Sequence, residues 1–385
     1  MTRIYLVRHA EAEGNLYRRA HGQYNGLLTK NGLAQAERLG DWFSRRPVDA
    51  VYASDLYRAV RTAEAVASVC RKPVRTDPAL REVCLGEWED RAWGGIIREH
   101  GNYMKWFDGE ETGWTVRGAE TVTEAGGRVA ASLSRIAAAH SGQYVAVVSH
   151  GSVLREVLTR AAGLRVPHLD NASVSLAEWE DGALRVKFIG DNRHLGELST
   201  HARQSWWRDG GKTDAELWFS PARLPEDAGP VMEYTRRTWE TVYSTEDGFH
   251  GESAERAIWE SAGTDPRYLQ FAMEGEKRIG LLHMRDAGRL SVSDGHIALL
   301  CLDSEKRGAG LGAQLLGEAV SVARGRGKTG LSLRVFQKNA QALSFYKKMG
   351  FLVCGYERGL FGTLIQMRMN IEVPETFGRP ARGAL

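Results

Sequence analysis

Cysteine is scarce in this sequence of 385 residues, and close cysteine pairs are absent. The four cysteines are widely spaced and form no C-x-x-C pair: Cys70, Cys84, Cys301 and Cys354. That pattern argues against a disulfide framework, and we expect reduced, buried thiols. His194 and His201 lie seven residues apart, with no acidic or sulfur ligand at metal-binding spacing. We therefore expect no metal site.

Long apolar runs and one-sided charge are also missing. No apolar stretch approaches the roughly 20 residues that a membrane-spanning helix requires. Lys and Arg total 51 against 48 Asp and Glu, a net charge of +3, and the two signs are interspersed along the chain. We therefore expect a cytoplasmic protein with neither a membrane nor a nucleic-acid partner.

What remains is the composition of an ordinary globular protein, with 43% hydrophobic and 26% charged residues. At about 150 residues per domain, this length predicts two or three domains. Apolar periodicity fades between Asp191 and Asp214, and we place the domain boundary there. The predicted organisation is a first domain over 1–197, a linker over 198–214, a second domain over 215–370 and a tail over 371–385.

The first domain alternates strand and helix patterns, which predicts an α/β sheet covered by helices. Buried strands are expected at Ile4–Val7, Asp49–Ala53 and Tyr144–Ser149, with helices at Gly32–Phe43, Tyr57–Cys70 and Thr121–Ala139. Two further strands, Ser175–Glu180 and Ala183–Ile189, flank Asp181 and Gly182. This dipeptide is a strong hairpin signal, so we expect a hairpin at one edge of the sheet.

The second domain has a mixed α+β pattern. Strands are expected at Leu217–Pro221, Tyr268–Glu274, Arg278–Met284, His296–Leu302, Leu331–Val335, Phe351–Tyr356 and Leu364–Met369. Helices are expected at Gly310–Arg324 and Ala340–Met349. Each half is long enough for its own core, so we expect a cut near Gly210 to leave two folded pieces.

Charged and titratable side chains follow the buried strands of the first domain. Arg8 and His9 come directly after the first strand, His150 follows another, and Arg58 lies shortly after the strand that ends at Ala53. Open α/β sheets bind their ligands at the carboxyl ends of the parallel strands, so we expect these side chains to lie close together. An imidazole that attacks phosphorus needs arginines around the phosphoryl oxygens and an acid for the leaving alcohol, for which we select Glu82.

These residues match the motifs of a known family, in its order and over about half the chain. The matching positions are Arg8, His9, Ala10, Glu11, Asn15, Gly22, Gln23, Leu28, Thr29, Gly32 and Gln35, then Ser54, Asp55, Leu56, Arg58, Ala59, Thr62 and Ala63, then Glu82, Gly86 and Trp88, and finally Ser149, His150 and Gly151. The pattern resembles the histidine phosphatase (phosphoglycerate-mutase-like) superfamily. The resemblance implies a three-layer α/β/α sandwich.

The same resemblance assigns roles to individual residues. It implies that His9 is the nucleophile that forms a phosphohistidine and that Glu82 is the proton donor. Arg8, Arg58 and His150 are implied to form the phosphate pocket, which Asn15 and Gln23 line. Ala10 stands where the family usually has glycine, which is a mild departure.

The stretch between Glu82 and His150 decides between two related activities. Mutases of this family carry a longer insertion there, so the shorter segment favours a phosphatase that is open to water over a mutase. Trp93, Trp106 and Trp114 lie within this segment. They are candidates for capping the pocket, and packing of their indoles in the core is an equally good interpretation.

A second motif follows the expected strand that ends at Leu302. Glycines occur at 308, 310 and 312, directly before a helical pattern. Unpaired amides at a helix start bind pyrophosphate, and glycine lets a phosphate approach the backbone. Alone, the turn is equally consistent with a plain strand-to-helix loop.

The residues around this turn, and a stretch about 30 residues later, add a second resemblance. They are Arg307, Gly308, Gly310 and Gly312, followed by Asn339, Ala340, Ala342, Phe345, Tyr346, Met349, Gly350 and Phe351. The pattern resembles the GNAT N-acetyltransferases, with Ser304 where a proline is common. It implies that acetyl-CoA binds along the strand at Leu302, at Arg307 and the amides of 308–312, and beside Asn339.

For the second domain, the sequence suggests a catalytic acid but leaves the catalytic base unassigned. By the resemblance, Tyr346 is the acid that protonates the leaving thiolate, although packing of its ring on the sheet is an alternative. The base remains open among Glu233, Glu246 and His296.

The sequence thus predicts a bifunctional enzyme that acts on a small phosphate ester and an amine acceptor, with acetyl-CoA as co-substrate and no metal. The alternative is a phosphatase regulated by an acetyl-CoA-sensing domain. The sequence identifies neither of the two substrates. It also does not establish the oligomeric state.

Overall fold

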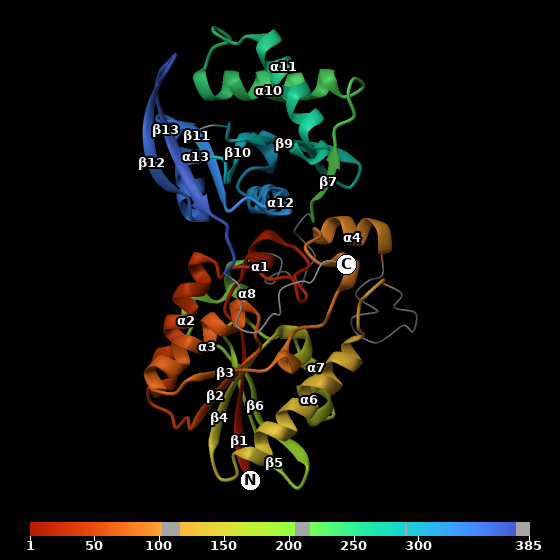
Figure 1. Cartoon of the computed structure of the whole chain (residues 1–385), viewed down its shortest axis with the longest axis vertical. Helices are drawn as coiled ribbons and strands as arrows, with labels where there is room; N and C mark the ends of the chain where they lie inside the picture. The colour runs from red at the N-terminus through yellow and green to blue at the C-terminus, as the bar shows by residue number, and fades with distance from the viewer. Residues whose placement is uncertain (102–115, 205–215, 289–290, 375–385) are drawn as a thin grey trace.

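The computed structural model describes residues 1–101, 116–204, 216–288 and 291–374, which form two domains stacked along the long axis (Figure 1). The N-terminal domain contains a six-stranded sheet of order β3-β2-β4-β1-β5-β6. Its strands are β1 (Thr2–Arg8), β2 (Ala50–Ala53), β3 (Val74–Thr76), β4 (Tyr144–Ser149), β5 (Val174–Glu180) and β6 (Ala183–Asp191). The first four run parallel, and β5 and β6 add the antiparallel hairpin at one edge, as predicted.

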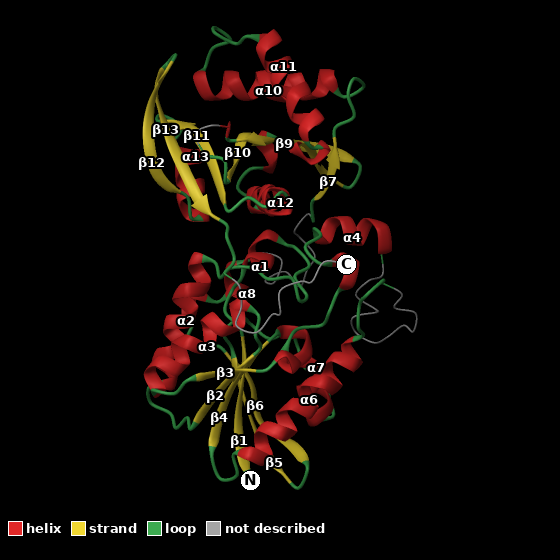
Figure 2. Ribbon diagram, in the orientation of Figure 1, coloured by secondary structure: helices red, strands yellow, loops and turns green. Residues whose placement is uncertain are grey.

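Helices cover both faces of this sheet, which gives the expected three layers (Figure 2). The helices are α1 (Glu13–Tyr17), α2 (Lys30–Phe43), α3 (Tyr57–Cys70), α4 (Trp93–His100), α6 (Val122–Ala139), α7 (Gly151–Ala162) and α8 (Thr200–Arg203). Successive β1 side chains alternate between the two cores. Ile4 and Leu6 pack in the cluster that includes α6 and α7, while Tyr5 and Val7 pack in the cluster that includes α2 and α3.

The C-terminal domain has a seven-stranded sheet of order β12-β13-β11-β10-β9-β8-β7. Its strands are β7 (Trp218–Pro221), β8 (Leu269–Glu274), β9 (Lys277–Asp286), β10 (Asp294–Leu302), β11 (Gly330–Phe336), β12 (Leu352–Gly359) and β13 (Gly362–Asn370). All neighbours pair antiparallel except β10 and β11. This mixed sheet with helices is the predicted α+β architecture.

Four long helices flank the second sheet: α10 (Ala228–Tyr243), α11 (Gly251–Thr264), α12 (Leu311–Gly325) and α13 (Ala340–Met349). The sequence predicted α12 and α13 but missed α10 and α11. Few side chains of the two missed helices are buried: Val231 in α10, and Ile258 and Ser261 in α11. The sequence also missed α7, although its buried Val153, Leu154, Val157 and Leu158 form a helical stripe.

The two domains share a packed interface between α1 and α12. Tyr17 of α1 is buried in the core cluster of the C-terminal domain. Arg19 donates to Asp90 in its own domain and to Glu318 of α12, at 2.9 and 2.7 Å. Arg324 of α12 forms a bidentate pair with Glu13 at 2.8 and 3.1 Å. The domains are therefore joined by apolar burial as well as by the chain itself.

This interface makes a prediction about Gly317, on the face of α12 that touches α1. A methyl group at Gly317 would overlap the Cβ of Tyr17, whereas Gly263 of α11 has open space around it. We expect Gly317→Ala to cost about 1–3 kcal/mol, because the helices must separate. At about 2–4 °C per kcal/mol, the midpoint of thermal unfolding falls by several degrees. Gly263→Ala is the control and should be neutral or slightly stabilising; equal midpoints for the two variants would contradict the interface.

A cut near Gly210, which we expect to leave two folded pieces, would also divide this interface between the pieces. That residue and the neighbouring Trp206 and Trp207 lie outside the described residues. Ser199 and Thr200, at the start of the predicted linker, donate to Asp170 and Glu11 of the N-terminal domain. Ile371, at the start of the predicted tail, is buried in the C-terminal core.

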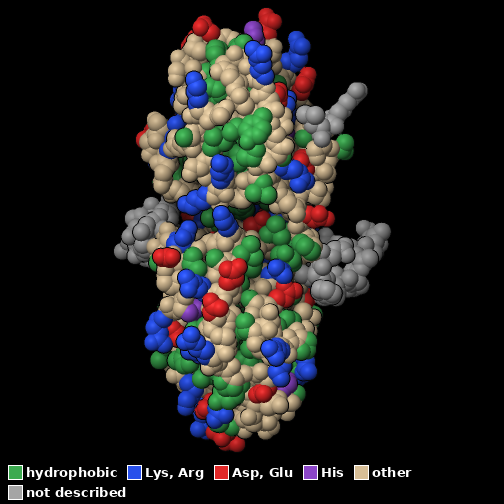
Figure 3. Space-filling view, turned by 90° about the vertical axis from the view of Figure 1, so that its left-hand side faces the viewer, with side chains coloured by type: hydrophobic (Ala, Val, Ile, Leu, Met, Phe, Trp, Pro, Cys, Tyr) green, Lys and Arg blue, Asp and Glu red, His purple; other side chains and the backbone are tan. Residues whose placement is uncertain are grey.

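The cysteines and the surface complete the description. All four cysteines are free thiols, but only Cys301 is buried, so the prediction of burial was wrong for the others. Cys354 is exposed because β12 is an edge strand. Hydrophobic side chains gather on the upper domain in Figure 3, and Leu352 and Tyr356 of β12 and Leu360 of the turn to β13 are exposed. Among the described helices, none is long and apolar enough to cross a membrane.

Candidate active sites

The first candidate site lies at the carboxyl ends of β1 and β4. These strands are parallel neighbours with Arg8 opposite Ser149, so His9 and His150 follow them side by side. The His9 amide donates to the Ser149 carbonyl at 2.9 Å, and the two imidazole centroids are 5.1 Å apart. Both histidines are buried. The structure therefore brings together the two residues that the sequence placed at strand ends.

Backbone contacts determine which nitrogen of His9 is available. Nδ1 lies 2.7 Å from the carbonyl oxygen of Ala10, an acceptor only, so Nδ1 carries the proton and Nε2 keeps its lone pair. Thr62 Oγ accepts from the Ala10 amide at 3.0 Å and holds this turn in place. Burial, followed by the charges of Arg58 and Arg8, keeps the pKa of His9 well below its usual value. A neutral imidazole with a free Nε2 results.

Two guanidinium groups stand beside this imidazole, that of the buried Arg58 and that of the partly buried Arg8. Arg58 donates to the carbonyls of Gly22 and Tyr24, at 2.6 and 2.9 Å, and burial lowers its pKa to about 10. Arg8 packs against the first residue of α7, where a Cβ at Gly151 would lie 3.0 Å from Nε. Glycine at 151 therefore permits the close approach of the Arg8 guanidinium.

Several polar atoms of this site have no protein partner. Arg8 Nε and both ring nitrogens of His150 are buried without a hydrogen bond in the part of the chain that the structure describes. Such orphaned groups are costly unless a ligand satisfies them. A phosphoryl group supplies acceptor oxygens in the required number, so the residues fit a phosphate ester.

Glu82 lies at the beginning of α7, against the same guanidinium groups. Its carboxylate accepts from the amides of Ser152 and Val153, at 3.0 and 3.2 Å. The pKa values of Arg8 and Arg58 both respond to its charge. Gln23 donates through Nε2 to the Glu82 carbonyl at 3.2 Å. Gln23 therefore touches the backbone of the predicted proton donor.

Asn171 is a residue of this site that the sequence analysis missed. Its Nδ2 donates to the carbonyl of His9 at 3.1 Å and to Oδ1 of Asn15 at 3.2 Å. The next residue, Ala172, has φ of 57° and donates its amide to the carbonyls of Arg8 and His9. No sequence spacing connects position 171 to position 9, so only the folded chain reveals this contact.

A second missed residue is His21. It is partly buried, and its charge is among the influences on the pKa of His9. A Cβ on Gly14 or Gly26 would overlap its ring, so small residues on both sides make room for it. The signal available in the sequence was the position of His21 next to Gly22, which is one of the residues that match the histidine phosphatase motifs.

The contacts of Asn171 predict an effect on catalysis. Asn171→Ala should lower kcat for phosphate-ester hydrolysis by about 10- to 100-fold, since loss of both bonds frees the turn that aims His9. Asn192→Ala is a matched control, because Asn192 bonds Asp170 at 3.0 Å and touches neither His9 nor Asn15. Steady-state kinetics on both variants make the comparison, and an Asn171→Ala enzyme as fast as the control would refute the positioning role.

The second candidate site is where β10 and β11 part. Their parallel pairing covers only Asp294–Ile297 against Gly330–Leu333, although β10 continues to Leu302 and β11 to Phe336. The unpaired edges form what we name the β10–β11 opening. Backbone groups along it are available to an extended chain such as a pantetheine arm.

The glycine turn stands at the end of this opening. Gly308 and Gly310 have φ of 84° and 85°, and a Cβ at either would meet open space. Glycine is therefore required there by backbone conformation rather than by crowding. Gly310 is the N-cap of α12, and no side chain caps the first amides of this helix, which suits them to an anion. The Arg307 guanidinium folds back onto the Leu302 carbonyl at 3.1 Å.

The remaining predicted residues of this domain lie on α13. Asn339 is its N-cap, and its side chain accepts from the amide of Ala342 at 3.1 Å. Tyr346 is buried between Phe345 and Phe351, and burial raises its pKa, so its hydroxyl keeps its proton. A Cβ at Gly312 would lie 3.2 Å from Phe345, so this glycine permits close packing of α12 on α13.

The three candidates for the base occupy different surroundings. Glu233 and Glu246 are exposed and lie near Arg237 and Arg236 respectively. His296 lies on the central strand β10, with Nδ1 3.1 Å from the Ser332 hydroxyl. Of the tryptophans, Trp93 begins α4 and packs at the edge of the core, whereas Trp106 and Trp114 lie outside the described residues.

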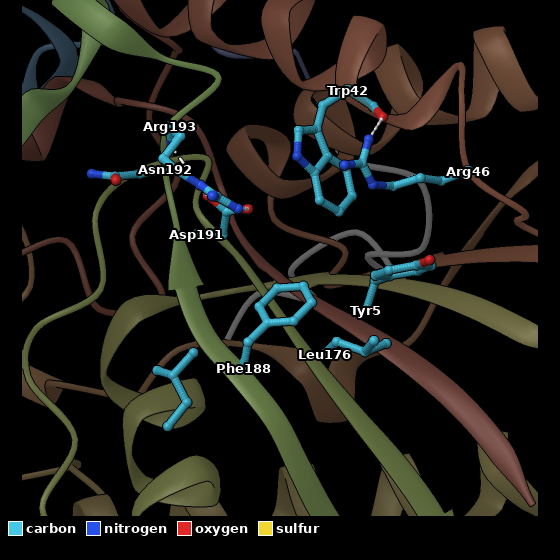
Figure 4. Close-up of a pocket in the computed structure, with 9 residues that line it drawn as sticks. Tyr5, Trp42, Arg46, Leu176, Phe188, Asp191, Asn192 and Arg193 are labelled. Carbon is cyan, nitrogen blue, oxygen red and sulfur yellow. Dashed lines mark hydrogen bonds and ion pairs between the residues drawn. The ribbon is translucent and has the colours of Figure 1, made fainter.

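A separate cavity of about 510 Å³ opens on the N-terminal domain (Figure 4). Its walls include Tyr5, Trp42, Arg46 and Phe188, and the Arg46 guanidinium lies 3.4 Å from the Trp42 ring centroid. None of its lining residues belongs to the phosphate site or to the β10–β11 opening. The cavity is therefore distinct from both candidate sites.

Comparison with known proteins agrees with both halves of this description. A model of the histidine phosphatase superfamily (branch 1) matches residues 4–192, and one of the acetyltransferase (GNAT) family matches residues 231–351. The N-terminal domain therefore belongs to the histidine phosphatase superfamily, and the C-terminal domain belongs to the GNAT family.

Individual relatives match the N-terminal half. The probable phosphoglycerate mutase GpmB of Proteus mirabilis (strain HI4320) is 32% identical over 210 residues, which cover 52% of this chain and 97% of that protein. The protein of the same name from Serratia proteamaculans (strain 568) is 33% identical over 206 residues, covering 51% and 95%. Among solved structures, Bacillus stearothermophilus YhfR is 27% identical with a TM-score of 0.47, covering 51% of this chain and 100% of that one.

Proposed function

We propose that the chain is a bifunctional enzyme: a phosphatase that hydrolyses a small phosphate monoester through a phosphohistidine, and an acetyltransferase that uses acetyl-CoA to acetylate an amine. The observation that carries the first half is the neutral His9. Its Nδ1 donates a hydrogen bond to the Ala10 carbonyl, and its Nε2 is free beside the guanidinium groups of Arg58 and Arg8.

The phosphatase reaction follows from these positions in two steps. Nε2 of His9 bonds to phosphorus while the ester oxygen leaves with a proton from Glu82. Arg8, Arg58 and His150 hold the phosphoryl oxygens and balance their charge. Water, deprotonated by Glu82, then cleaves the nitrogen–phosphorus bond, and inorganic phosphate leaves.

A mutase is the second candidate for this domain, because curated relatives bear that name. Both activities pass through phosphohistidine and differ in what accepts the phosphoryl group. Incubation with 3-phosphoglycerate separates them: release of inorganic phosphate supports a phosphatase, and formation of the 2-phospho isomer without phosphate release supports a mutase.

For the second half, the glycine turn and the β10–β11 opening support acetyl-CoA binding. The amides at the start of α12 suit the pyrophosphate, and the unpaired edge of β10 near Leu302 suits the pantetheine arm. Tyr346, whose hydroxyl keeps its proton because burial raises its pKa, is our candidate for the acid that protonates the leaving sulfur. Asn339 also has a structural role as the N-cap of α13.

The test of both halves is a metabolite screen on the purified full-length chain. Phosphate release from a panel of esters and release of CoA from acetyl-CoA with a panel of amines are measured separately. If acetyl-CoA binds and changes the phosphatase rate but is not consumed, the regulatory alternative is favoured over an acetyltransferase activity.

A further inference from the structure

An uncompensated positive charge lies on the sheet face that α11 approaches. Arg285 of β9 stands directly opposite His296 of β10 in the antiparallel pairing. Directly opposed residues share a face. His283, two residues before Arg285, bonds the Ser261 hydroxyl of α11 at 2.9 Å, which identifies this face as the α11 side.

The same face continues onto β11. His296 pairs with Ser332, and Arg334 follows two residues later, so its side chain leaves on the same side. We name Arg285, His296, Ser332 and Arg334 the arginine–histidine row. The pairing of β10 with β11 ends one residue after His296, so the row borders the β10–β11 opening.

The charges of this face do not cancel. Arg334 pairs with Glu357 at 3.0 Å, and Arg368 pairs with Asp294 at 2.8 Å. Arg285 has neither an ion pair nor a hydrogen bond among the described residues, and partial burial, followed by the charge of Arg334, lowers its pKa. It is nevertheless exposed, as are Ala298 and Arg334, so a molecule from solvent reaches it.

The hydrogen bonds of His296 hold its imidazole in one tautomer at this position. The Ser332 hydroxyl donates its only hydrogen to the Gly295 carbonyl at 3.3 Å, so it accepts from Nδ1 of His296. Nε2 therefore carries the lone pair. Burial, then Arg285 and Arg334, lowers the pKa of His296 to about 4, so the imidazole is neutral near pH 7.

We propose that the acetyl acceptor is an amine that also carries an anionic group, a carboxylate or a phosphate, which Arg285 binds so that the amine nitrogen faces Nε2 of His296. This inference rests on the acetyltransferase function proposed above. A guanidinium holds either anion through two parallel hydrogen bonds. The arrangement thus selects the acceptor by its charge and places its nitrogen at the opening.

The transfer step balances with groups of this chain. The amine nitrogen bonds to the acetyl carbonyl carbon, and the carbon–sulfur bond breaks. The proton lost by the amine goes to Nε2 of His296, and the Tyr346 hydroxyl gives a proton to the departing sulfur. The products are the N-acetylated anionic amine and CoA, and proton exchange with water restores both side chains.

The experiment uses matched amine pairs with the full-length protein. Phosphoethanolamine is compared with ethanolamine, and β-alanine with propylamine, with CoA and acetylated product measured by chromatography. We expect the anionic member of at least one pair to exceed its neutral partner in kcat/KM by about 10-fold or more. The preferred pair distinguishes phosphate from carboxylate.

Variants assign the preference to the row. Arg285→Gln should lower kcat/KM for the anionic amine by about 10-fold and leave the neutral amine nearly unchanged. Arg256→Gln, on the exposed surface of α11, is the matched control and should behave as the parent. His296→Gln should lower kcat while acetyl-CoA affinity, measured by calorimetry, stays the same.

Each other outcome overturns the inference and identifies which claim failed. If acetyl-CoA binds and neutral amines react as well as anionic ones, or no anionic amine reacts, the acceptor class is wrong and the acetyl-CoA site stands. The same conclusion follows if Arg285→Gln does not lower kcat/KM for the anionic amine. If acetyl-CoA does not bind at all, the proposed acetyltransferase function fails and takes the acceptor site with it.

Discussion

Replacement of His9 by alanine is expected to reduce phosphate-ester hydrolysis by at least about 1,000-fold, on the scale of losing a covalent nucleophile. Nε2 of His9 is the only group at the ends of β1 and β4 that we assign as nucleophile, and the Ala10 carbonyl determines the tautomer. Brief incubation of the parent protein with a ³²P-labelled ester, followed by an alkaline quench, should trap labelled phosphohistidine. The His9→Ala protein should trap none.

Two controls define this result. His250→Ala, on the exposed N-terminal side of α11 in the other domain, should keep full phosphatase activity. A chelator should leave the parent rate unchanged, because Arg8 and Arg58 supply the positive charge that a metal ion provides elsewhere. Undiminished turnover by His9→Ala would exclude the phosphohistidine mechanism.

Replacement of Gly310 by aspartate is expected to weaken acetyl-CoA binding by at least ~100-fold, measured by calorimetry. The new carboxylate would stand at the N-cap of α12, where the pyrophosphate is expected. It would take the helix amides for itself and repel the phosphates, and two like charges a few ångströms apart near a protein surface repel by a few kcal/mol.

The other end of the same helix offers a matched control. Gly327 follows α12 with φ of 69°, and, like Gly310, it has open space around its missing side chain. Gly327→Asp therefore carries a similar cost of left-handed backbone without a charge at the pyrophosphate position. Both variants should unfold at similar temperatures, and only Gly310→Asp should lose acetyl-CoA. Equal affinities for the two would reject the assigned site.

The contact between α1 and α12 connects the two proposed sites. α12 begins at the glycine turn, and its middle packs on α1, which carries Asn15 of the phosphate site. Asn15 Oδ1 also accepts from the Ala12 amide at 3.0 Å. Any change in the α1–α12 packing, as in Gly317→Ala, is therefore best assayed for both activities as well as for stability.

Sequence by itself determined the parts that depend on local pattern. The bounds of α3, α13 and β4 agree with the prediction because short apolar runs and helical periodicity are local properties. The sequence also predicted that His9 and His150 lie close together, since residues that follow neighbouring parallel strands meet at one sheet edge. The glycines at 308 and 310 were identified because they precede a helical pattern and resemble the acetyl-CoA turn of the GNAT family. The structure adds that positive φ, rather than crowding, requires glycine there.

Only the tertiary structure decided the contacts between distant segments. Asn171 reaches His9 across 162 positions, and Arg19 reaches Glu318 across 299, distances in sequence over which no periodicity carries information. The arginine–histidine row is assembled from three strands, and its unpaired charge appears only when their register is known. Polar contacts of this kind depend on the exact positions of groups from separate elements, whereas apolar burial leaves its pattern along the chain.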